Sequence, residues 1–346
     1  MKIFVVNCGS SSIKYELFEM PSEASLAEGL LSRVGGDAEL RHTAGETRWT
    51  RGVSAGDYRE GMRHVLDALA GGESPVLRGI DQIAGVGHRV VHCGGELGDS
   101  AVVDEAVLEV VRRSTPLAPL HNPPNLAGIE AAREAVPHAP HVAVFDTAFF
   151  AALPPRAYRY AVPESWYADH RVRKYGFHGT SHRYVTLRAA ELLGRNPDQT
   201  DLITVHLGSG SSMTAVRGGA PVDHSMGFTP LEGLVMGTRS GDLDPAVVLY
   251  MQRQGLSPEQ VDHALSFESG LLGVSGVSND MRDVLSAAES GDERAALALE
   301  LFVYRIVKYV GAYYTILPRV DAVVLTGGIG ENARKVRGRI VRALIR

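Results

Sequence analysis

Three glycine-rich segments contain residue types that bind phosphate groups. Gly9-Ser10-Ser11 and Gly208-Ser209-Gly210-Ser211-Ser212 each join two short apolar runs, and Thr326-Gly327-Gly328-Ile329-Gly330-Glu331-Asn332 follows a third run. Glycine lets backbone N–H groups approach phosphate oxygens without hindrance from a Cβ atom, and a serine hydroxyl adds a further donor. One such loop is more often an ordinary hairpin turn, but three in one chain indicate a protein that binds a nucleotide or another phosphorylated ligand.

None of these loops has the spacing of the two commonest nucleotide-binding motifs. The chain contains no GxxxxGK[ST] sequence, and no GxGxxG follows its first apolar run. The third loop precedes an expected helix, where unpaired N–H groups and the helix dipole favour an anion. We therefore expect phosphate binding of a kind that differs from P-loop and Rossmann proteins.

The first two loops lie in similar surroundings near the start of each half of the chain. Alternating apolar residues predict strands at Lys2–Val6 and Ile13–Phe18, which form a hairpin around the first loop. The runs Leu202–Leu207 and Met213–Val216 predict the same hairpin around the second loop. This repetition favours an internal duplication, in which each copy opens with a hairpin.

The chain of 346 residues exceeds the size at which a single hydrophobic core stops growing, so two domains are expected. A proline-rich stretch follows residue 115, and we place the boundary just after the predicted strand Val142–Phe145, giving domains 1–147 and 148–346. A further strand is predicted at Ala322–Leu325. Strands mixed with long helices predict an α/β fold. The expected helices are Asp57–Ala70, Asp104–Arg113, His182–Leu193, Asp244–Gln254 and Glu293–Leu317.

The composition excludes several classes of protein. Hydrophobic residues make up 45% and charged residues 22% of the chain, which is too apolar for a disordered protein. A net charge of −5 disfavours nucleic acid as a partner, so individually placed arginines must hold any anion. Cys8 and Cys93 have no metal-ligand or disulfide spacing. Without a signal-like or membrane-spanning apolar stretch, we expect a soluble, cytoplasmic protein that does not bind membranes.

Long motifs in a fixed order resemble those of the acetate kinase family, which also includes propionate and butyrate kinases. Together they extend over nearly the whole chain, which makes the resemblance specific. The matching segments are Phe4–Lys14 (FVVNCGSSSIK), Gly87–His92 (GHRVVH), Pro119–Asn125 (PLHNPPN), Val144–Phe149 (VFDTAF), Tyr175–His182 (YGFHGTSH), Asp223–Pro245, Gly270–Asp283 and Thr326–Asn332.

The resemblance implies the duplicated two-domain fold of the actin and sugar kinase superfamily, which is ribonuclease H-like and binds ATP in the interdomain cleft. It also implies reversible phosphoryl transfer from ATP to acetate by direct in-line attack. The implied cofactor is Mg²⁺ or Mn²⁺, and the implied assembly is a homodimer. Propionate or butyrate could replace acetate, because one methylene in an apolar pocket is worth only about 1–3 kcal/mol.

The resemblance implies five residues that act on the reacting groups. Arg89 and Arg239 would hold the acyl carboxylate and the phosphoryl group, a task that suits the planar, permanently charged guanidinium. His178 would donate a hydrogen bond to the phosphoryl group, and His121 would position substrate. Asp146 belongs to the Mg-ATP site. We expect it to orient metal-bound water rather than act as a base, because a carboxylic acid of pKa about 4–5 is already ionised at neutral pH.

The remaining implied residues form an acyl pocket and a nucleotide site. The acyl methyl group would contact Val91, Leu120, Phe177 and Pro230, for which simple core packing is the alternative interpretation. The metal would be held near Asn7. The residues implied in nucleotide binding are Lys14, His206, Leu207, Gly208, Ser209, Gly210, Asp280, Met281, Arg282, Gly328, Ile329, Gly330, Glu331 and Asn332.

Two other patterns favour simpler interpretations. His178 and His182 have the i, i+4 spacing of a zinc pair, but no HExxH sequence or third ligand accompanies them. Asp244-Pro245 predicts an N-cap followed by proline at the first helical position, so Asp244 is expected to be structural.

The chain also departs from the family pattern. The family continues through a further C-terminal segment that supplies a metal-binding glutamate, and this segment is not present in the sequence. Ser209 and Phe150 replace residues that are usually Asn and His. These departures leave open a rival hypothesis, a nucleotide-binding protein that does not turn over.

Overall fold

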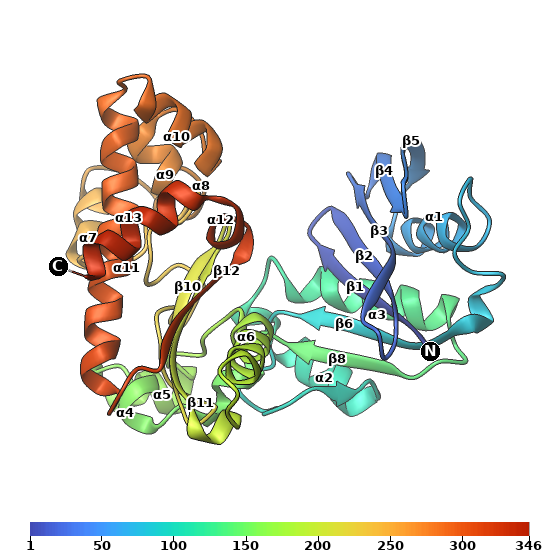
Figure 1. The fold of residues 1–346 in the computed structure, drawn as a ribbon, viewed down its shortest axis with the longest axis horizontal. Helices are drawn as coiled ribbons and strands as arrows, with labels where there is room; N and C mark the ends of the chain where they lie inside the picture. Colours follow the sequence, from blue (N-terminus) through green and yellow to red (C-terminus); the bar gives the residue numbers. More distant parts are fainter. Residues whose placement is uncertain (346) are drawn as a thin grey trace. The chain divides into compact units, whose positions relative to one another are not determined.

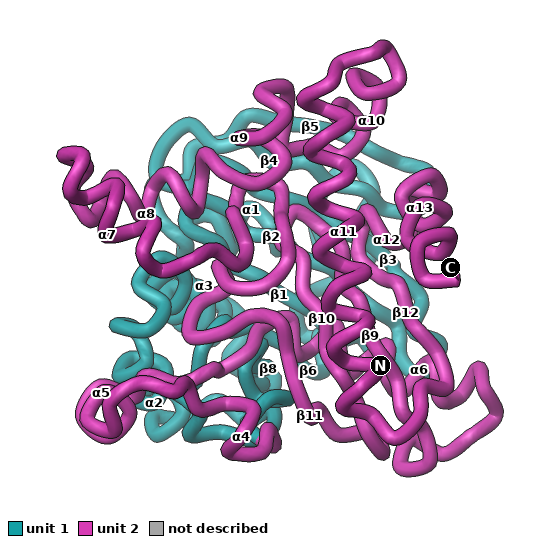
Figure 2. Tube along the Cα trace, turned by 90° about the vertical axis from the view of Figure 1, so that its left-hand side faces the viewer, with its two compact units in different colours: residues 1–151 teal, residues 152–346 magenta. Residues whose placement is uncertain are grey.

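The computed structural model describes residues 1–345. The chain folds into two compact units, one of residues 1–151 (unit 1) and one that starts at residue 152 (unit 2), coloured separately in Figure 2. Each unit has its own sheet and its own hydrophobic core, as expected of a domain. Within residues 1–345, no helix is long and apolar enough to cross a membrane.

Unit 1 is built on an eight-stranded mixed sheet with the order β5-β4-β3-β2-β1-β6-β8-β7 (Figure 1). Strands β1 to β5 form an antiparallel meander, while β1, β6 and β8 are parallel neighbours. The carboxyl ends of these three parallel strands therefore share one edge of the sheet. The strands are β1 (Lys2–Gly9), β2 (Ser12–Glu19), β3 (Ala24–Ser32), β4 (Gly36–Ala44), β5 (Thr47–Ala55), β6 (Ile83–Val90), β7 (Ala101–Val102) and β8 (His141–Phe145).

Two helices of unit 1 pack together over this sheet. Helix α1 (Tyr58–Ala70) contacts β2 to β5, and α3 (Asn122–Ala135) contacts β1 and β6. Asp57 caps α1 by accepting a hydrogen bond of 2.9 Å from the backbone N–H of Glu60. The buried α1 residues recur at helical spacing, which explains the docking of its apolar face. The other helical segments are α2 (Glu105–Arg113), η1 (Ile80–Gln82) and η2 (Thr115–Leu117), and η3 (Ala148–Ala152) ends at the first residue of unit 2.

Unit 2 contains a four-stranded sheet with the order β11-β10-β9-β12. The sheet separates two different environments. Apolar residues of β9 pack against α11, whereas the polar residues between them face α6. The strands are β9 (Asp201–Leu207), β10 (Ser211–Arg217), β11 (Ala220–His224) and β12 (Ala322–Thr326). The helical segments are α4 (Pro155–Tyr158), α5 (Glu164–His170), α6 (Gly179–Leu192), η4 (Pro197–Gln199), α7 (Ala246–Arg253), α8 (Pro258–Phe267), α9 (Gly270–Ser275), α10 (Met281–Glu289), α11 (Glu293–Ile316), α12 (Gly327–Asn332) and α13 (Arg334–Leu344).

Four strands of the unit 1 sheet have the same topology as the whole unit 2 sheet, which confirms the predicted duplicated α/β fold. In unit 1 the antiparallel hairpin β1–β2 is extended by the parallel strand β6, and in unit 2 the hairpin β9–β10 is extended by the parallel strand β12. A third antiparallel strand, β3 or β11, pairs with the second strand of each hairpin. This is the arrangement expected of a ribonuclease H-like fold.

Most predicted helices and strands are confirmed to within a few residues, with three local corrections. Helix α6 begins at Gly179, before the predicted His182, because His178 adopts a left-handed conformation with φ of 59° that starts the helix. Helix α7 begins at Ala246, so Asp244 lies one position before the N-cap, although its Oδ1 still accepts from Ala246 N at 2.9 Å. Ser212 lies in β10 rather than in a phosphate loop.

Candidate active site

Arg89 and Asp146 form a bidentate ion pair at the carboxyl edge of the unit 1 sheet. Arg89 lies one residue before the end of β6, and Asp146 follows the last residue of the parallel neighbour β8. The guanidinium donates from Nε to Oδ1 at 3.0 Å and from Nη2 to Oδ2 at 2.6 Å. The pair is asymmetric in exposure, since 39% of the Arg89 side chain and 2% of the Asp146 side chain are accessible. Attraction to Asp146 raises the pKa of Arg89.

Two asparagines of α3 hold the chain at the end of β6, the strand that carries Arg89. Asn125 donates to the carbonyl of Cys8 at 2.7 Å and accepts from the backbone N–H of Val91 at 3.0 Å, so it joins the ends of β1 and β6. Asn122 donates to the carbonyl of His92 at 3.0 Å. Both asparagines are buried. Neither asparagine was predicted to be functional, although two prolines lie at the start of the helix that places them.

The remaining unit 1 residues of the predicted site differ in exposure. Val91 is buried directly after β6, whereas Leu120 is 58% exposed. His121 occupies the N-cap position of α3. Asn7 and Lys14 are directly paired across the β1–β2 hairpin. The bond from Val91 to Asn125 places the end of β6 against α3, the helix that His121 precedes, and Asn7 lies on the neighbouring strand β1.

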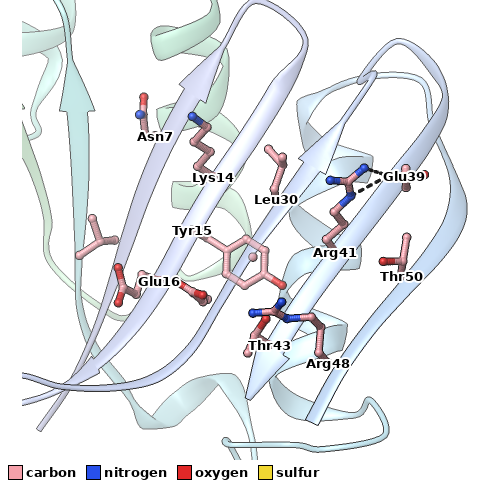
Figure 3. A pocket seen from close by; sticks show the side chains of 13 residues that line it. Asn7, Lys14, Tyr15, Glu16, Leu30, Glu39, Arg41, Thr43, Arg48 and Thr50 are labelled. Atoms are coloured by element: carbon pink, nitrogen blue, oxygen red, sulfur yellow. Dashed lines mark hydrogen bonds and ion pairs between the residues drawn. The ribbon is translucent and has the colours of Figure 1, made fainter. Parts of the chain in front are cut away.

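Asn7 and Lys14 also lie at one end of a cavity of about 730 Å³ on the β1–β5 sheet (Figure 3). Charged side chains of both signs line this cavity, and Arg41 is paired with Glu39 at 2.7 Å. The cavity thus continues from the predicted metal and nucleotide residues along the strands of unit 1.

His178 and Arg239 approach the glycine-rich loop of unit 2 from two segments. A Cβ atom placed on Gly210 would lie 3.3 Å from His178 Nε2 and 3.4 Å from Arg239 Nη1. The absence of a side chain at this position therefore allows both groups to lie against the loop. Burial lowers the pKa of Arg239. A guanidinium remains charged at neutral pH, so this end of the loop carries a fixed positive charge suited to phosphate.

The loop between β11 and α7 carries Arg239 and is tied to the unit 2 core. Arg239 Nη1 donates to the carbonyl of Pro230 at 3.2 Å. Asp242 accepts from the backbone N–H of Gly233 at 2.7 Å and pairs with Arg305 of α11 at 3.1 Å. Arg305 also donates to the carbonyl of Gly233 at 3.0 Å. Asp242 and Arg305, which were not predicted as functional, thus join Gly233 before Arg239 to Asp242 after it and fix the loop between them.

Phe177 is held just before His178 by a histidine of β11. His224 Nε2 accepts from the backbone N–H of Phe177 at 3.1 Å, and its Nδ1 lies 2.9 Å from Thr214 Oγ1. Since a backbone N–H can only donate, His224 carries its proton on Nδ1, from which it donates to Thr214. Burial lowers the pKa of His224 well below its usual value, which keeps this neutral form.

A second cavity, of about 810 Å³, brings together many of the predicted nucleotide residues of unit 2. Asp280 caps α10 and forms an ion pair with Arg282, whose hydrogen bond lowers the pKa of Asp280 to about 2. Of the predicted residues, Leu207, Gly210, Gly330, Glu331 and His206 do not belong to its lining. The predicted residues that line it are Gly208, Ser209, Asp280, Met281, Arg282, Gly328, Ile329 and Asn332.

His178 and His182, which have the spacing of a zinc pair, share a different partner. In the part of the chain that the structure describes, no group of three His, Cys, Asp or Glu side chains is placed to hold a metal ion. The predicted i, i+4 pair instead converges on one hydroxyl, because His178 Nδ1 and His182 Nε2 each lie 2.8 Å from Ser212 Oγ.

Comparison with known proteins gives one consistent family. The model of the acetokinase family matches residues 2–345. The acetate kinase of Pseudothermotoga lettingae is 50% identical over 98% of this chain and 84% of that protein, and the acetate kinase of Methanosarcina thermophila is 48% identical over 99% and 85%.

Solved structures agree with this comparison. The crystal structure of Porphyromonas gingivalis acetate kinase matches with a TM-score of 0.95 and 43% identity, over 98% of this chain and 86% of that one. A propionate kinase from Francisella tularensis matches with a TM-score of 0.94 and 40% identity, over 99% and 88%. The chain therefore belongs to the acetokinase family of kinases.

Proposed function

We propose that this protein transfers the γ-phosphoryl group of ATP to acetate, reversibly and with a divalent metal. A carboxylate oxygen of acetate attacks the γ-phosphorus, and the bond from that phosphorus to the β–γ bridging oxygen breaks, giving acetyl phosphate and ADP. No proton is transferred, because acetate is ionised at neutral pH. The task of the protein is therefore to position two anions and to balance their charge.

The observation that carries this proposal is the anchored guanidinium of Arg89. Asp146 uses Nε and one Nη2 hydrogen, so the hydrogens of Nη1 point to the other side of the fork, where an anion would bind. Val91 follows two residues later and offers an apolar contact for a methyl group. A hydroxyl substrate, such as glycerol, would not require a cation at this position.

Unit 2 supplies the groups that we assign to the phosphoryl chain. Arg239 and His178 both approach Gly210, and the 810 Å³ cavity begins at the neighbouring Gly208 and Ser209. We assign the adenosine to this cavity and the γ-phosphate to the end of the loop near Gly210. Arg239 then balances the charge that spreads over the phosphoryl oxygens, and His178 donates a hydrogen bond to one of them.

The residues present fit a magnesium ion. Mg²⁺ keeps several water ligands and takes few protein groups besides nucleotide phosphates, so an amide oxygen and one carboxylate suffice. We propose Asn7 as the amide group that holds the metal, and Asp146 as the carboxylate that orients a water bound to it. Asp146 would orient this water beside Arg89, which it binds through both carboxylate oxygens. When bound, Mg²⁺ or Mn²⁺ would neutralise phosphate charge. A homodimer and a cytoplasmic location complete the proposal.

The acyl substrate is the finer part of the proposal. The relatives include both acetate kinases and a propionate kinase, so propionate is the second candidate. Incubation of the purified chain with Mg-ATP, hydroxylamine and acetate, propionate, butyrate or glycerol separates these possibilities, because acyl phosphate is trapped as hydroxamate. Acetate should give the highest kcat/KM. Equal or better use of propionate would reassign the substrate, and ATP binding without hydroxamate would favour a protein that binds nucleotide without turnover.

A further inference from the structure

A chain of four side chains runs through the buried polar layer between α6 and the unit 2 sheet. Thr204 Oγ1 lies 2.7 Å from His182 Nδ1, and His182 Nε2 lies 2.8 Å from Ser212 Oγ. Ser212 Oγ in turn lies 2.8 Å from His178 Nδ1. Thr204, His182 and Ser212 are all fully buried. His178 is therefore connected to the interior through Nδ1, while its Nε2 faces Gly210.

The direction of these hydrogen bonds decides what His178 offers to a ligand. A neutral imidazole carries one proton, so the bond made by one nitrogen determines whether the other donates or accepts. Ser212 has a single hydroxyl hydrogen. It can donate to only one of the two histidines and must accept from the other, provided that both imidazoles are neutral.

The surroundings of Nε2 select one of the two directions. A Cβ atom placed on Gly210 would lie 3.3 Å from His178 Nε2 and 3.4 Å from Arg239 Nη1. Because the guanidinium is positively charged, an anion is the ligand that suits this position. Phosphate oxygens accept hydrogen bonds, which requires a proton on Nε2 of His178. The nearby guanidinium also opposes a second proton on this ring.

We propose that Ser212 and His182 are positioning residues that hold His178 in the Nε2-protonated neutral form. In this chain Thr204 donates to His182 Nδ1, His182 Nε2 donates to Ser212, and Ser212 donates to His178 Nδ1. The outermost N–H of His178 then points at the phosphoryl site. This inference rests on the proposed role of His178 in phosphoryl transfer, but the hydrogen-bond chain can be tested without any substrate.

The first test is the tautomer of His178 in the full-length protein. Long-range ¹H–¹⁵N correlation spectra of selectively ¹⁵N-histidine-labelled protein report which ring nitrogen carries the proton, and the His178→Gln spectrum assigns the signal. We expect the Nε2-protonated form in the parent. Ser212→Ala should shift the ring toward a tautomer mixture. A parent ring protonated on Nδ1, or an unchanged tautomer in Ser212→Ala, would overturn the inference.

The second test is kinetic and uses matched variants. Ser212→Ala should lower kcat for acetyl phosphate formation about tenfold to a hundredfold while the KM for ATP changes little, because a partner of a functional histidine is lost. Ser212→Thr keeps the hydroxyl and should restore most of the rate. The control Thr186→Val removes another buried hydroxyl, which bonds the carbonyl of His182 at 2.7 Å, and should retain kcat.

The outcomes separate this inference from the proposed function. If His178→Gln keeps full kcat while the tautomer responds to Ser212→Ala, the chain exists but the assigned role of His178 is wrong. If Ser212→Ala and Thr186→Val lose kcat equally, in proportion to a lower melting temperature, Ser212 serves stability alone and the positioning role is refuted.

Discussion

Asp146→Asn separates the anchoring of Arg89 from other roles of this carboxylate. The amide oxygen can accept one of the two Arg89 hydrogen bonds, but the amide NH₂ meets the other guanidinium N–H as a second donor. The bidentate geometry of 3.0 and 2.6 Å is then lost, and Arg89 can rotate away from its functional orientation. We expect kcat/KM for acetate to fall about 10²- to 10³-fold, the usual effect of losing one preorganised charge-stabilising group.

The same change has a smaller effect on stability. Leaving one member of a buried ion pair unpartnered costs about 3–5 kcal/mol, but water reaches Arg89, which is 39% exposed. We therefore expect the free energy of unfolding to fall by only about 1–2 kcal/mol, so the variant should fold. Urea titration measures this loss, and Asp37→Asn, at an exposed site in β4, serves as the matched control.

A double-mutant cycle with Arg89→Ala tests the reasoning. If Asp146 acts mainly by holding Arg89, the double variant should be no slower than Arg89→Ala, with a coupling energy of about 3 kcal/mol. If the two losses in kcat/KM multiply, Asp146 acts independently of Arg89, as a metal ligand or as a base. That result would refute the anchoring argument, even if Asp146→Asn alone had the predicted effect.

Three further predictions test other parts of the structure. Val91→Ala removes two methyl groups and leaves more space for an acyl chain beside Arg89, so the ratio of propionate to acetate kcat/KM should rise about tenfold, as measured by hydroxamate formation; an unchanged ratio would place the acyl chain elsewhere. Arg305→Met removes the ion pair with Asp242, and we expect kcat to fall at least tenfold while the ATP affinity measured by calorimetry stays near that of the wild type. Loss of ATP affinity alone would contradict a role of Arg305 in positioning the loop that carries Arg239. Burial next to His141 lowers the pKa of His88 to about 3, so below pH 6.5 the unfolded chain binds a proton that the folded protein does not. The free energy of unfolding should therefore fall by up to about 1.4 kcal/mol per pH unit from pH 6.5 toward pH 3. In urea titrations, His88→Gln should reduce this dependence on pH.

The sequence predicted the elements better than the contacts between them. Helices α1 and α2 were recognised from their aspartate caps and amphipathic spacing, which are local signals. The start of α6 was missed because it depends on the left-handed backbone of His178, a conformation that residues other than glycine seldom adopt. Family motifs pointed to Arg89 and Asp146 separately, but their ion pair depends on the parallel pairing of β6 with β8, which no local pattern specifies.

Ser212 lies near the predicted phosphate loop, but its hydroxyl bonds two histidines and does not lie in that loop. In the sequence it belongs to a glycine- and serine-rich loop, which suggested contact with phosphate. In the structure β10 begins at Ser211, and strand alternation turns the Ser212 hydroxyl toward α6. The pairing of Ser212 with His206 in β9 fixes this orientation, and the register of a hairpin is not visible in composition alone.

The placement of buried polar groups provides an independent argument for where the chemistry occurs. Burying an amide, hydroxyl or imidazole costs stability unless each finds a partner, and an apolar layer would give the same sheets more stability with fewer constraints. In unit 1 the buried asparagines of α3 lie at the carboxyl ends of parallel strands, next to Arg89. In unit 2 the polar layer under α6 leads to His178 and Gly210. Folding alone does not require either arrangement, whereas the proposed binding of an anion by Arg89 and of phosphate by His178 requires rigid donors, and the proposal accounts in this way for polar networks in place of apolar packing.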